Sequence, residues 1–501
     1  MSSLDWDAAE AALEAAFDWG KTEPGGAMVV FDLSGLRLSR ARGVESLATL
    51  TPFSLDTISR FASVTKQVFA SFVLSHPETI SLDDPLSQHL PMLSAPLGAI
   101  SVGRALDMSG GVPDTRECLT LIGLSSFDQS FAPELLDFHA RMPRPNYRPG
   151  TEVHYSNGGY RLVEEAMRAH GLLFRDFVAG QLRDGMGLAL HAMEMWTDPL
   201  AGLAPGYWHD DAGWHEGFQG MHLSAAGSLA GSVRALAGWG RALLANEGVF
   251  EGRLAALSAP RHLLDGTATH YGLGMRDQFL GQKRLVGHGG SQPGYKSYIL
   301  LDPHSATGCA IVANRDDANT SDIAQQVMAA LLGEPLPEPR SDLTPGLYVS
   351  ETGGDWLEVR GNAVSRLDDE VALFPNAEGT FASPSPTGLL ELRMEGDAIV
   401  GRADHAPVRF LPAQDAAPAP SLEGEWLSDS YGARFTIEDG HVVMGAGPRR
   451  FRAALRAIGR DTFLFERPDS HATHRICLHR LDEHRVTLKL SRAKVIDYRR
   501  V

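Results

Sequence analysis

The sequence is poor in cysteine and has neither a long apolar run nor an excess of positive charge. Its three cysteines, Cys118, Cys309 and Cys477, are scattered and form no C-x-x-C pair, which is typical of a reduced, intracellular protein. The first residues are acidic and amphipathic, so they lack the basic start and apolar core of a signal peptide. No apolar run reaches the length that spans a bilayer. We therefore expect a soluble, cytoplasmic protein.

The charge and the length of the chain limit its partners and its number of domains. A formal net charge of -17 argues against nucleic acid or an anionic membrane as the main partner. An acidic surface suits a cationic or zwitterionic small ligand, although it often serves solubility alone. At 501 residues the chain is longer than one hydrophobic core supports, so two or three domains are expected.

Residues 1–333 have the mixed pattern of one large α/β unit. An acidic helix is expected over about residues 4–19, followed by a buried strand over residues 27–31. Further strand patterns cover residues 297–301 and 309–313. A last helical pattern then stops at a glycine, and a Pro-rich segment follows it as a plausible linker.

Beyond the linker the helical patterns vanish, and two similar pieces follow over residues 341–412 and 421–501. The run Gly346-Leu-Tyr-Val-Ser in the first piece is echoed by Gly424-Glu-Trp-Leu-Ser in the second. Each run is followed by an alternating strand pattern and a glycine-containing turn. This internal repetition predicts two small antiparallel β-barrels or sandwiches in tandem.

The two pieces differ in one place. After Phe463 the second piece runs from Leu464 to His474 before its next strand pattern, whereas the first piece is shorter after Phe381. An extended loop on a rigid barrel is often functional, although a tolerated surface insertion explains the difference equally well.

The pattern S-x-x-K occurs twice, at Ser63–Lys66 and at Ser491–Lys494. Only the first copy opens a run with the apolar spacing of a buried helix, where residues three apart share a face and the Lys66 ammonium approaches the Ser63 hydroxyl. Burial lowers the pKa of a lysine and lets it act as a general base. The second copy lies in an arginine-rich, strand-like tail, where alternation separates the two side chains. The alternative interpretation of Ser63 is a helix cap beside a solvated lysine.

A second candidate element is Tyr155-Ser156-Asn157, after a Pro-Gly turn. A tyrosine near a lysine can share its proton, acting as base for the serine and then as acid for a leaving amine. The amide of Asn157 can orient a substrate amide. Taken alone, this element is more often a structured loop.

A third candidate element is His288-Gly289-Gly290, in a glycine-rich stretch. The glycines permit close approach of a substrate backbone, and a following N–H, that of Ser291, can complete an oxyanion hole with the N–H of Ser63. A lone histidine in such a stretch is usually a turn residue. The three elements are weak one by one, but their order, spacing and context are jointly specific.

Together these elements resemble the S-x-x-K, Y-x-N and K/H-x-G motifs of the penicillin-binding protein and serine β-lactamase superfamily. Within it the chain is similar to the bacterial D-aminopeptidases. This resemblance rests on the tandem β pieces and on three runs, Ser63-Val-Thr-Lys-Gln67, Lys283-Arg-Leu-Val-Gly-His-Gly-Gly290 and Tyr498-Arg-Arg-Val501. The resemblance implies an α/β (α+β) β-lactamase-like catalytic domain over residues 1–333. Two antiparallel β-barrel domains would follow over residues 341–412 and 421–501, and the protein would be a homodimer.

The resemblance also implies a reaction, with no cofactor. It is the hydrolysis of N-terminal D-amino acids (D-Ala, D-Ser, or achiral Gly) from short peptides, amides and esters through an acyl-enzyme on Ser63. Lys66 and Tyr155 would move the proton, and His288 would shape the pocket and polarise Tyr155. His288 and Gly289 stand where other members have a lysine and a hydroxyl residue that face a substrate carboxylate. Their presence here fits a substrate that is recognised at its amino end.

In the D-aminopeptidases a loop from the last β domain limits the site to short substrates, and an aspartate on it binds the substrate's α-ammonium. By position the loop is residues 465–475 and the aspartate is Asp469. Because the local alignment is loose, Glu466 remains an alternative.

Other functions were weighed against this one. Four histidines cluster near the C-terminus, but their spacing is not that of a helix-borne zinc motif and no matched carboxylate accompanies them, so no metal is expected; they are His471, His474, His479 and His484. Within the superfamily the alternatives are an esterase, a D-amino-acid amidase and a D,D-carboxypeptidase. The alternative from a different class is a binding or sensor protein that keeps the fold. The presence of all four residues argues against a pure binder; they are Ser63, Lys66, Tyr155 and His288.

Overall fold

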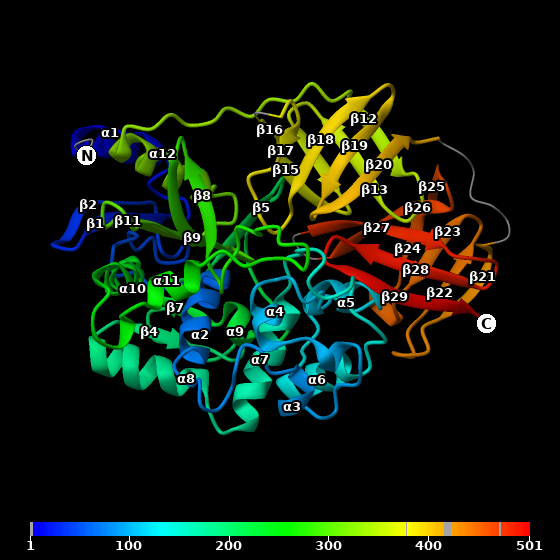
Figure 1. The fold of residues 1–501 in the computed structure, drawn as a ribbon, viewed down its shortest axis with the longest axis horizontal. Helices are drawn as coiled ribbons and strands as arrows, with labels where there is room; N and C mark the ends of the chain where they lie inside the picture. The colour runs from blue at the N-terminus through cyan, green and yellow to red at the C-terminus, as the bar shows by residue number, and fades with distance from the viewer. Residues whose placement is uncertain (1–3, 377, 415–421, 470–471) are drawn as a thin grey trace. The chain divides into compact units, whose positions relative to one another are not determined.

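The computed structural model describes residues 4–376, 378–414, 422–469 and 472–501. Contacts between these residues divide the chain into two compact units (Figure 1). The first unit consists of Met1–Ser81, Val163–Arg261 and Ala268–Pro337, and the second of Leu82–Leu162, His262–Thr267 and Glu338–Val501. The units interleave along the sequence and do not follow the three predicted domains, whose boundaries stay a prediction. Each unit is described by itself below.

The first unit is built on an antiparallel sheet, six-stranded among the described residues, with the strand order β2-β1-β11-β10-β9-β8. Helices cover both faces of this sheet, which is why the strand predicted over residues 27–31 is apolar without alternation. The strands are β1 (Gly26–Asp32), β2 (Gly35–Arg42), β8 (Arg276–Leu280), β9 (Lys283–Gln292), β10 (Tyr295–Asp302) and β11 (Thr307–Ala313).

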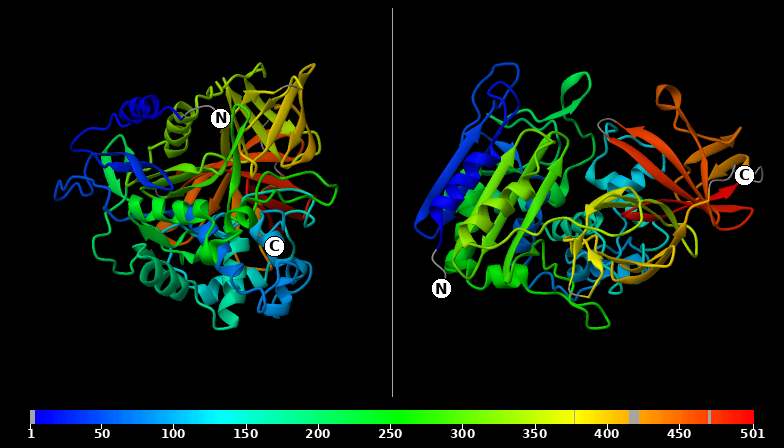
Figure 2. Two further views of the ribbon diagram at one scale, coloured as in Figure 1. Left: turned by 60° about the vertical axis from the view of Figure 1, so that its left-hand side comes forward. Right: turned by 90° about the horizontal axis from the view of Figure 1, so that it is seen from above.

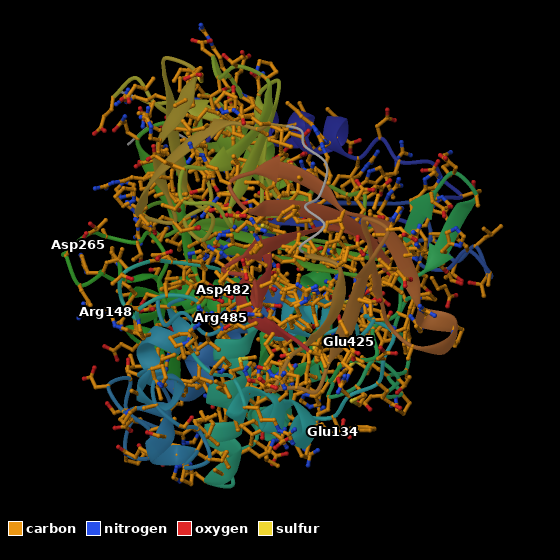
Figure 3. All side chains as sticks on the ribbon, turned by 90° about the vertical axis from the view of Figure 1, so that its right-hand side faces the viewer. Glu134, Arg148, Asp265, Glu425, Asp482 and Arg485 are labelled. Atoms are coloured by element: carbon orange, nitrogen blue, oxygen red, sulfur yellow. The ribbon has the colours of Figure 1, made fainter. Side chains whose placement is uncertain are left out.

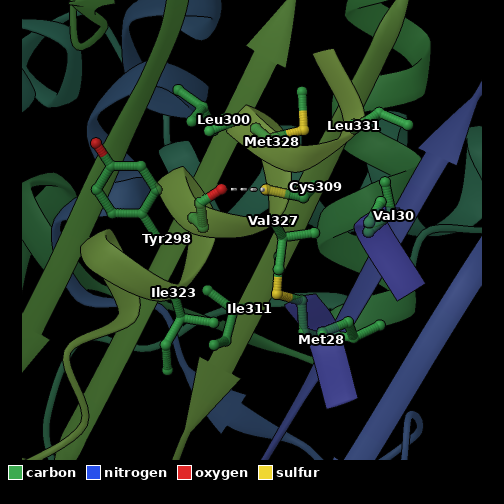
Figure 4. Close-up of a cluster of buried hydrophobic side chains, with 14 of the residues drawn as sticks. Met28, Val30, Tyr298, Leu300, Cys309, Ile311, Ile323, Val327, Met328 and Leu331 are labelled. Carbon is green, nitrogen blue, oxygen red and sulfur yellow. Dashed lines mark hydrogen bonds between the residues drawn. The ribbon is translucent and has the colours of Figure 1, made fainter. Parts of the chain in front are cut away.

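One face of the sheet packs against α1 (Trp6–Ala16) and α12 (Thr320–Leu332) in a cluster that includes Met28, Leu300 and Cys309 (Figure 4). The other face packs against α10 (Val233–Ala245), where Gly240 lies against three side chains of the sheet; they are Phe31, Ile299 and Leu301. Successive side chains of a strand point to opposite faces, so β1 and β10 contribute to both layers. The helix α12 ends at Gly333 in the left-handed conformation, at the predicted stop.

The rest of the first unit is made of short elements. In chain order they are β3 (Ser59–Arg60), η1 (Ala62–Val64), α2 (Thr65–Val73), the later part of α7 (Asn157–Ala169), α8 (Phe174–Phe177), η3 (Val178–Asp184), β4 (Leu190–Ala192), β5 (Tyr207–Asp210), β6 (Gly213–Glu216), α9 (Ser224–Gly227), β7 (Leu229–Gly231), η4 (Gly248–Phe250) and α11 (Arg253–Ser258).

The second unit combines a helical segment with two large antiparallel sheets. The helical segment contains α3 (Leu86–His89), η2 (Leu97–Ala99), α4 (Val102–Leu106), α5 (Thr115–Leu121), α6 (Ala132–Ala140) and the beginning of α7.

The two sheets have the same topology. Within the described residues each has nine strands, in the order β15-β14-β13-β12-β20-β19-β18-β17-β16 and β24-β23-β22-β21-β29-β28-β27-β26-β25 (Figures 1 and 2). The second order is the first one moved along by nine strands, so the internal repetition predicted from the sequence is confirmed. Both sheets are barrel-like and nearly closed.

The strands of the first sheet are β12 (Gly346–Ser350), β13 (Trp356–Arg360), β14 (Ala363–Arg366), β15 (Asp369–Ala372), β16 (Phe374–Pro375), β17 (Phe381–Ala382), β18 (Leu390–Glu395), β19 (Ala398–Ala403) and β20 (Ala406–Pro412). Those of the second sheet are β21 (Gly424–Leu427), β22 (Arg434–Glu438), β23 (His441–Met444), β24 (Phe451–Ala454), β25 (Arg456–Gly459), β26 (Thr462–Asp469), β27 (Ala472–Arg480), β28 (Arg485–Leu490) and β29 (Ala493–Arg500), with the turn η6 (Gly447–Arg449).

The segment that was expected to be an extended loop is a β-hairpin. Strands β26 and β27 pair along their whole length, from Thr462 opposite His479 to Asp469 opposite Ala472. The corresponding β17 in the first sheet has only two residues, so the second copy is longer, as expected, but the extra length is strand. Residues 470–471 between the two strands, and residue 421 at the predicted start of the second barrel, lie outside the described residues.

Exposed ion pairs are frequent on the second sheet. Asp482, on the connection between β27 and β28, lies 2.7 Å from Arg485, the first residue of β28, and both are at the surface (Figure 3). Pairs in full contact with water contribute about 0–1 kcal/mol each, so the apolar layers described above dominate the stability of the fold.

Candidate active site

The first S-x-x-K element forms a close pair of side chains in the first unit. Ser63 lies in the turn η1, and Lys66 lies in the first turn of α2, whose residues are all buried. The Nζ atom of Lys66 donates to Oγ of Ser63 at 3.0 Å and to the carbonyl of Ala226 at 2.8 Å. The exposed fraction of Lys66 is 0%. The structure therefore brings the two side chains together as the spacing predicts, with the lysine out of contact with bulk water.

The turn that carries Ser63 is fixed by the sheet. Ala62 has a φ of 47°, a left-handed conformation that is costly for a residue with a side chain. The carbonyl of Phe61 accepts from the Ser297 hydroxyl at 2.7 Å, and a Cβ at Gly290 would lie 2.1 Å from the same carbonyl oxygen. Because only glycine permits that approach, Gly290 seats β9 directly against the Ser63 turn.

His288 is buried on β9 and makes hydrogen bonds through both ring nitrogens. Nδ1 lies 2.6 Å from the carbonyl of Gly289, and Nε2 lies 3.1 Å from the hydroxyl of Tyr271. Burial, reinforced by the charges of Arg276 and Lys66, holds the pKa of His288 well below its usual value. The imidazole is therefore neutral: Nδ1 donates to the carbonyl, and Nε2 accepts from Tyr271.

Ser291, the next candidate on β9, is exposed, and its hydroxyl accepts from Nζ of Lys296 at 2.8 Å. Its side chain is thus engaged with a neighbouring strand. A role in an oxyanion hole would fall to its backbone N–H.

Tyr155 and Asn157 belong to the second unit, at the start of α7. The backbone N–H and the side-chain amide of Asn157 both donate to Oδ2 of Asp114, at 2.9 and 2.8 Å. The guanidinium of Arg492 lies over the ring of Tyr155, 4.9 Å from its centroid. The residue between Val153 and Tyr155, His154, contacts Asp404 at 3.3 Å, and the N–H of Val153 donates to the Asp404 carbonyl.

The two candidates for the ammonium anchor differ in environment. Asp469 is only 6% exposed, and its carboxylate accepts from the hydroxyl of Ser125 at 2.5 Å and from the N–H of Ser126 at 2.9 Å. On the same strand, Arg467 donates to the carbonyls of Thr120 and Leu124. The end of the β26–β27 hairpin is therefore fastened to the segment after α5. Glu466, by contrast, points outward and is exposed.

Several residues that the sequence did not nominate contact the candidates. They include Asp114, Ser125, Tyr271 and Arg492. Ser491 and Lys494 of the second S-x-x-K are not paired with each other: the serine donates to Glu117 at 3.0 Å, and Nζ of the lysine lies 3.3 Å from Nδ1 of His154. The repeated motif was the only sequence signal near Arg492.

The C-terminal histidines have other partners. Nδ1 of His474 lies 3.0 Å from Asp368, and His479 lies beside Lys489. His471 is outside the described residues. Within the part of the chain that the structure describes, no three His, Cys, Asp or Glu side chains are grouped to hold a metal ion. A search of the same residues for a helix long and apolar enough to cross a membrane finds none.

Comparison with known proteins gives consistent relatives. The beta-lactamase family model matches residues 11–333. A D-aminopeptidase of Cereibacter sphaeroides is 23% identical over 92% of this chain and 91% of its own length. A D-aminopeptidase of Brucella ovis is 26% identical over 84% of this chain and 83% of its own.

Solved structures show the same fold. The octameric penicillin-binding protein homologue from Pyrococcus abyssi superposes with a TM-score of 0.58 at 17% identity, covering 99% of this chain and all of its own. The D-amino acid amidase from Ochrobactrum anthropi SV3 superposes with a TM-score of 0.54 at 20% identity, covering 65% of this chain and 98% of its own. The predicted fold class, a β-lactamase-like domain followed by two antiparallel barrel-like sheets, is confirmed. The chain belongs to the beta-lactamase family.

Proposed function

We propose that the protein is a serine hydrolase that removes N-terminal D-amino acids from short peptides, amides and esters through an acyl-enzyme on Ser63. The observation that carries the proposal is the buried Lys66 side chain, whose Nζ atom lies 3.0 Å from the Ser63 hydroxyl. A buried lysine beside a serine is the arrangement that activates such a nucleophile. The relatives named D-aminopeptidase, similar along most of the chain, support the substrate class.

The proposed reaction follows from the chemistry of these groups. Oγ of Ser63 attacks the carbonyl of the first residue while the neutral Lys66 amine takes its proton. Tyr155 accepts this proton from Lys66 and passes it to the leaving amine. The N–H groups of Ser63 and Ser291 stabilise the oxyanion. Water then attacks the acyl-enzyme; the same two groups take a proton from the water and return a proton to Oγ of Ser63, which is released. Asn157, held by Asp114, orients the substrate amide.

The neutral state of His288 supports recognition from the amino end. A lysine at this position would present a full positive charge to a substrate carboxylate. Burial keeps the pKa of His288 low, and its Nδ1–H donates a hydrogen bond to the Gly289 carbonyl. The neutral imidazole therefore offers no positive charge to a substrate carboxylate. A substrate whose C-terminal side carries no nearby carboxylate is then accepted without a penalty.

A matched panel tests the stereochemistry. D-Ala p-nitroanilide should be hydrolysed with a kcat/KM about 100-fold or more above that of the L-isomer. The panel should include the glycine anilide, D-Ala amide, a short-chain ester that lacks an amino group, and an acyl-D-Ala-D-Ala peptide. Equal rates for the two enantiomers contradict the proposal. Preference for the amide, the ester or the acyl-peptide identifies an amidase, an esterase or a D,D-carboxypeptidase, and labelling of Ser63 without turnover identifies a binding protein.

The ammonium anchor is tested at Asp469. As anchor, it would exchange its bond to Ser125 for the substrate's ammonium. Asp469→Asn should then raise KM for free-amine substrates about tenfold or more and leave KM for the amine-free ester unchanged. The control is Ser125→Ala, which removes a partner of Asp469 but not its charge. An equal effect of both variants on all substrates assigns Asp469 a fastening role, and an effect of Glu466→Gln alone moves the anchor to that residue.

Assembly and location are also proposals. We infer a homodimer, although the relative from Pyrococcus abyssi is octameric. Light scattering of the purified chain measures the mass directly. A cytoplasmic location is supported by the three cysteines, which are buried and form no disulfide.

A further inference from the structure

The turn between β28 and β29 of the second sheet presents Arg492 to Tyr155, and its backbone is held firmly. The N–H of Arg492 donates to Glu117 at 2.6 Å. Its carbonyl accepts from the N–H of Asp114 at 2.9 Å and from the side-chain amide of Asn146 at 2.8 Å. Three bonds to one residue of a two-residue turn fix the point from which its side chain leaves the sheet.

Asp114 links this turn to the Y-x-N element. Its N–H donates to Arg492, while its carboxylate accepts twice from Asn157. The same residue caps α5 through the N–H of Glu117 at 3.2 Å. Because Asp114 binds both residues, a displacement of the turn at Arg492 would also displace Asn157, two positions after Tyr155.

The Arg492 guanidinium lies 4.9 Å from the centre of the Tyr155 ring, and both side chains line one pocket of the second unit. A cation over an aromatic face is attracted by a neutral phenol. It is attracted much more strongly by a phenolate, because the ring then carries a full charge. The contact thus favours the deprotonated form of Tyr155.

The acidic groups near Arg492 leave part of its charge uncompensated. The carboxylates of Glu117 and Asp369 lie 3.9 and 3.7 Å from the guanidinium nitrogens of Arg492, and both distances are longer than a hydrogen bond. Burial raises the pKa of Glu117 to about 7, so this carboxyl is partly protonated at neutral pH. The charged and titratable groups around the pair in this unit include Asp114, Glu117, His154, Arg366, Asp369, Asp404 and Lys494.

We propose that Arg492 is a positioning residue of the reaction, which holds the ring of Tyr155 and stabilises the phenolate that accepts a proton from Lys66 and passes it to the leaving amine. The inference rests on the proposed function in one respect, namely that Tyr155 takes part in the proton transfer. It assigns to the second S-x-x-K copy a supporting role, since Ser491 fastens Glu117 beneath the turn. The second sheet then contributes a residue that supports the proton transfer.

A phenolate titration tests the proposal without any substrate. Ultraviolet difference absorbance between the protein and its Tyr155→Phe variant isolates the ionisation of Tyr155. In the Arg492→Gln background the midpoint should move up by about one pH unit or more, and in the Arg492→Lys background by less. Glu117→Gln should lower the Tyr155 midpoint, because above neutral pH the substitution removes a negative charge that disfavours the phenolate. The control is Arg485→Gln, an exposed arginine at the opposite end of β28, which should leave the midpoint in place.

Kinetics provide the second readout. Arg492→Gln should lower kcat roughly tenfold at neutral pH, recover at higher pH and leave KM within about twofold, since Arg492 does not touch the substrate. An unchanged Tyr155 midpoint overturns the proposal, whatever happens to kcat. A raised KM at constant kcat would instead make Arg492 a substrate contact. If the unmodified protein hydrolyses no D-aminoacyl anilide, the proposed function fails, while the titration still decides the role of Arg492.

Discussion

Replacement of Ser63 by alanine is expected to abolish both the burst of product and steady-state turnover of D-Ala p-nitroanilide. The substitution removes the only atom of this residue that can form the acyl-enzyme, so the reaction loses its covalent route. Loss of a nucleophile of this kind costs about 10⁴-fold or more in kcat. The fold should persist, because the change deletes one oxygen from a turn held by backbone contacts to Ser297 and Gly290.

Ser71→Ala is the matched control for that experiment. Ser71 lies on α2, is 1% exposed, and its hydroxyl makes no hydrogen bond within the described residues. Its removal should leave kcat and thermal stability close to those of the unmodified protein. Hydrolysis retained by Ser63→Ala above a few per cent would contradict the assignment of the nucleophile.

Replacement of Lys66 by methionine has the next largest expected effect. Methionine fills a similar volume but cannot accept the Ser63 proton, so kcat should fall by about 10³-fold, within the range for general-base catalysis. Stability should fall slightly, because the buried carbonyl of Ala226 loses its donor. Lys66→Arg should not restore activity, since a guanidinium keeps its proton at all accessible pH values.

Calorimetry and burst kinetics on the same samples separate the two effects of the Lys66 change. Lys21→Met, at an exposed position, controls for the loss of one positive charge. A Lys66→Met protein that keeps the acylation burst would remove Lys66 from the role of base. A protein that fails to fold would show instead that the Nζ bond to Ala226 is essential for stability, and Lys66→Arg would then report on the base alone.

The parts predicted from the sequence are those set by short-range periodicity. The meeting of Ser63 and Lys66 follows from three residues of helical rise, and the buried strand over residues 27–31 follows from an unbroken apolar run. The duplicated sheets could be predicted because each copy kept its turns and strand starts. These features depend on residues that are only a few positions apart in the sequence, and periodicity analysis detects relations at that separation.

The parts that could not be predicted depend on contacts between distant residues. Asp469 meets Ser125 across 344 positions, and Arg492 meets Glu117 across 375. The sequence predicts a loop after Phe463 because the run there is longer than the matching run after Phe381. The run after Phe463 is a strand because Arg467 and Asp469, which face inward, find partners in the segment after α5. The residues after Phe463 contain no pattern from which these distant partners could be predicted.

The matching strand orders of the two sheets have a consequence for the segment that carries Tyr155. The turn between β19 and β20 corresponds in order to the turn between β28 and β29. The first turn carries Asp404, which contacts His154, and the second carries Arg492, which covers Tyr155. The two sheets thus bring one turn each, with opposite charges, to the same three-residue stretch. Loss of either sheet would remove one of these two contacts, so neither sheet can replace the other.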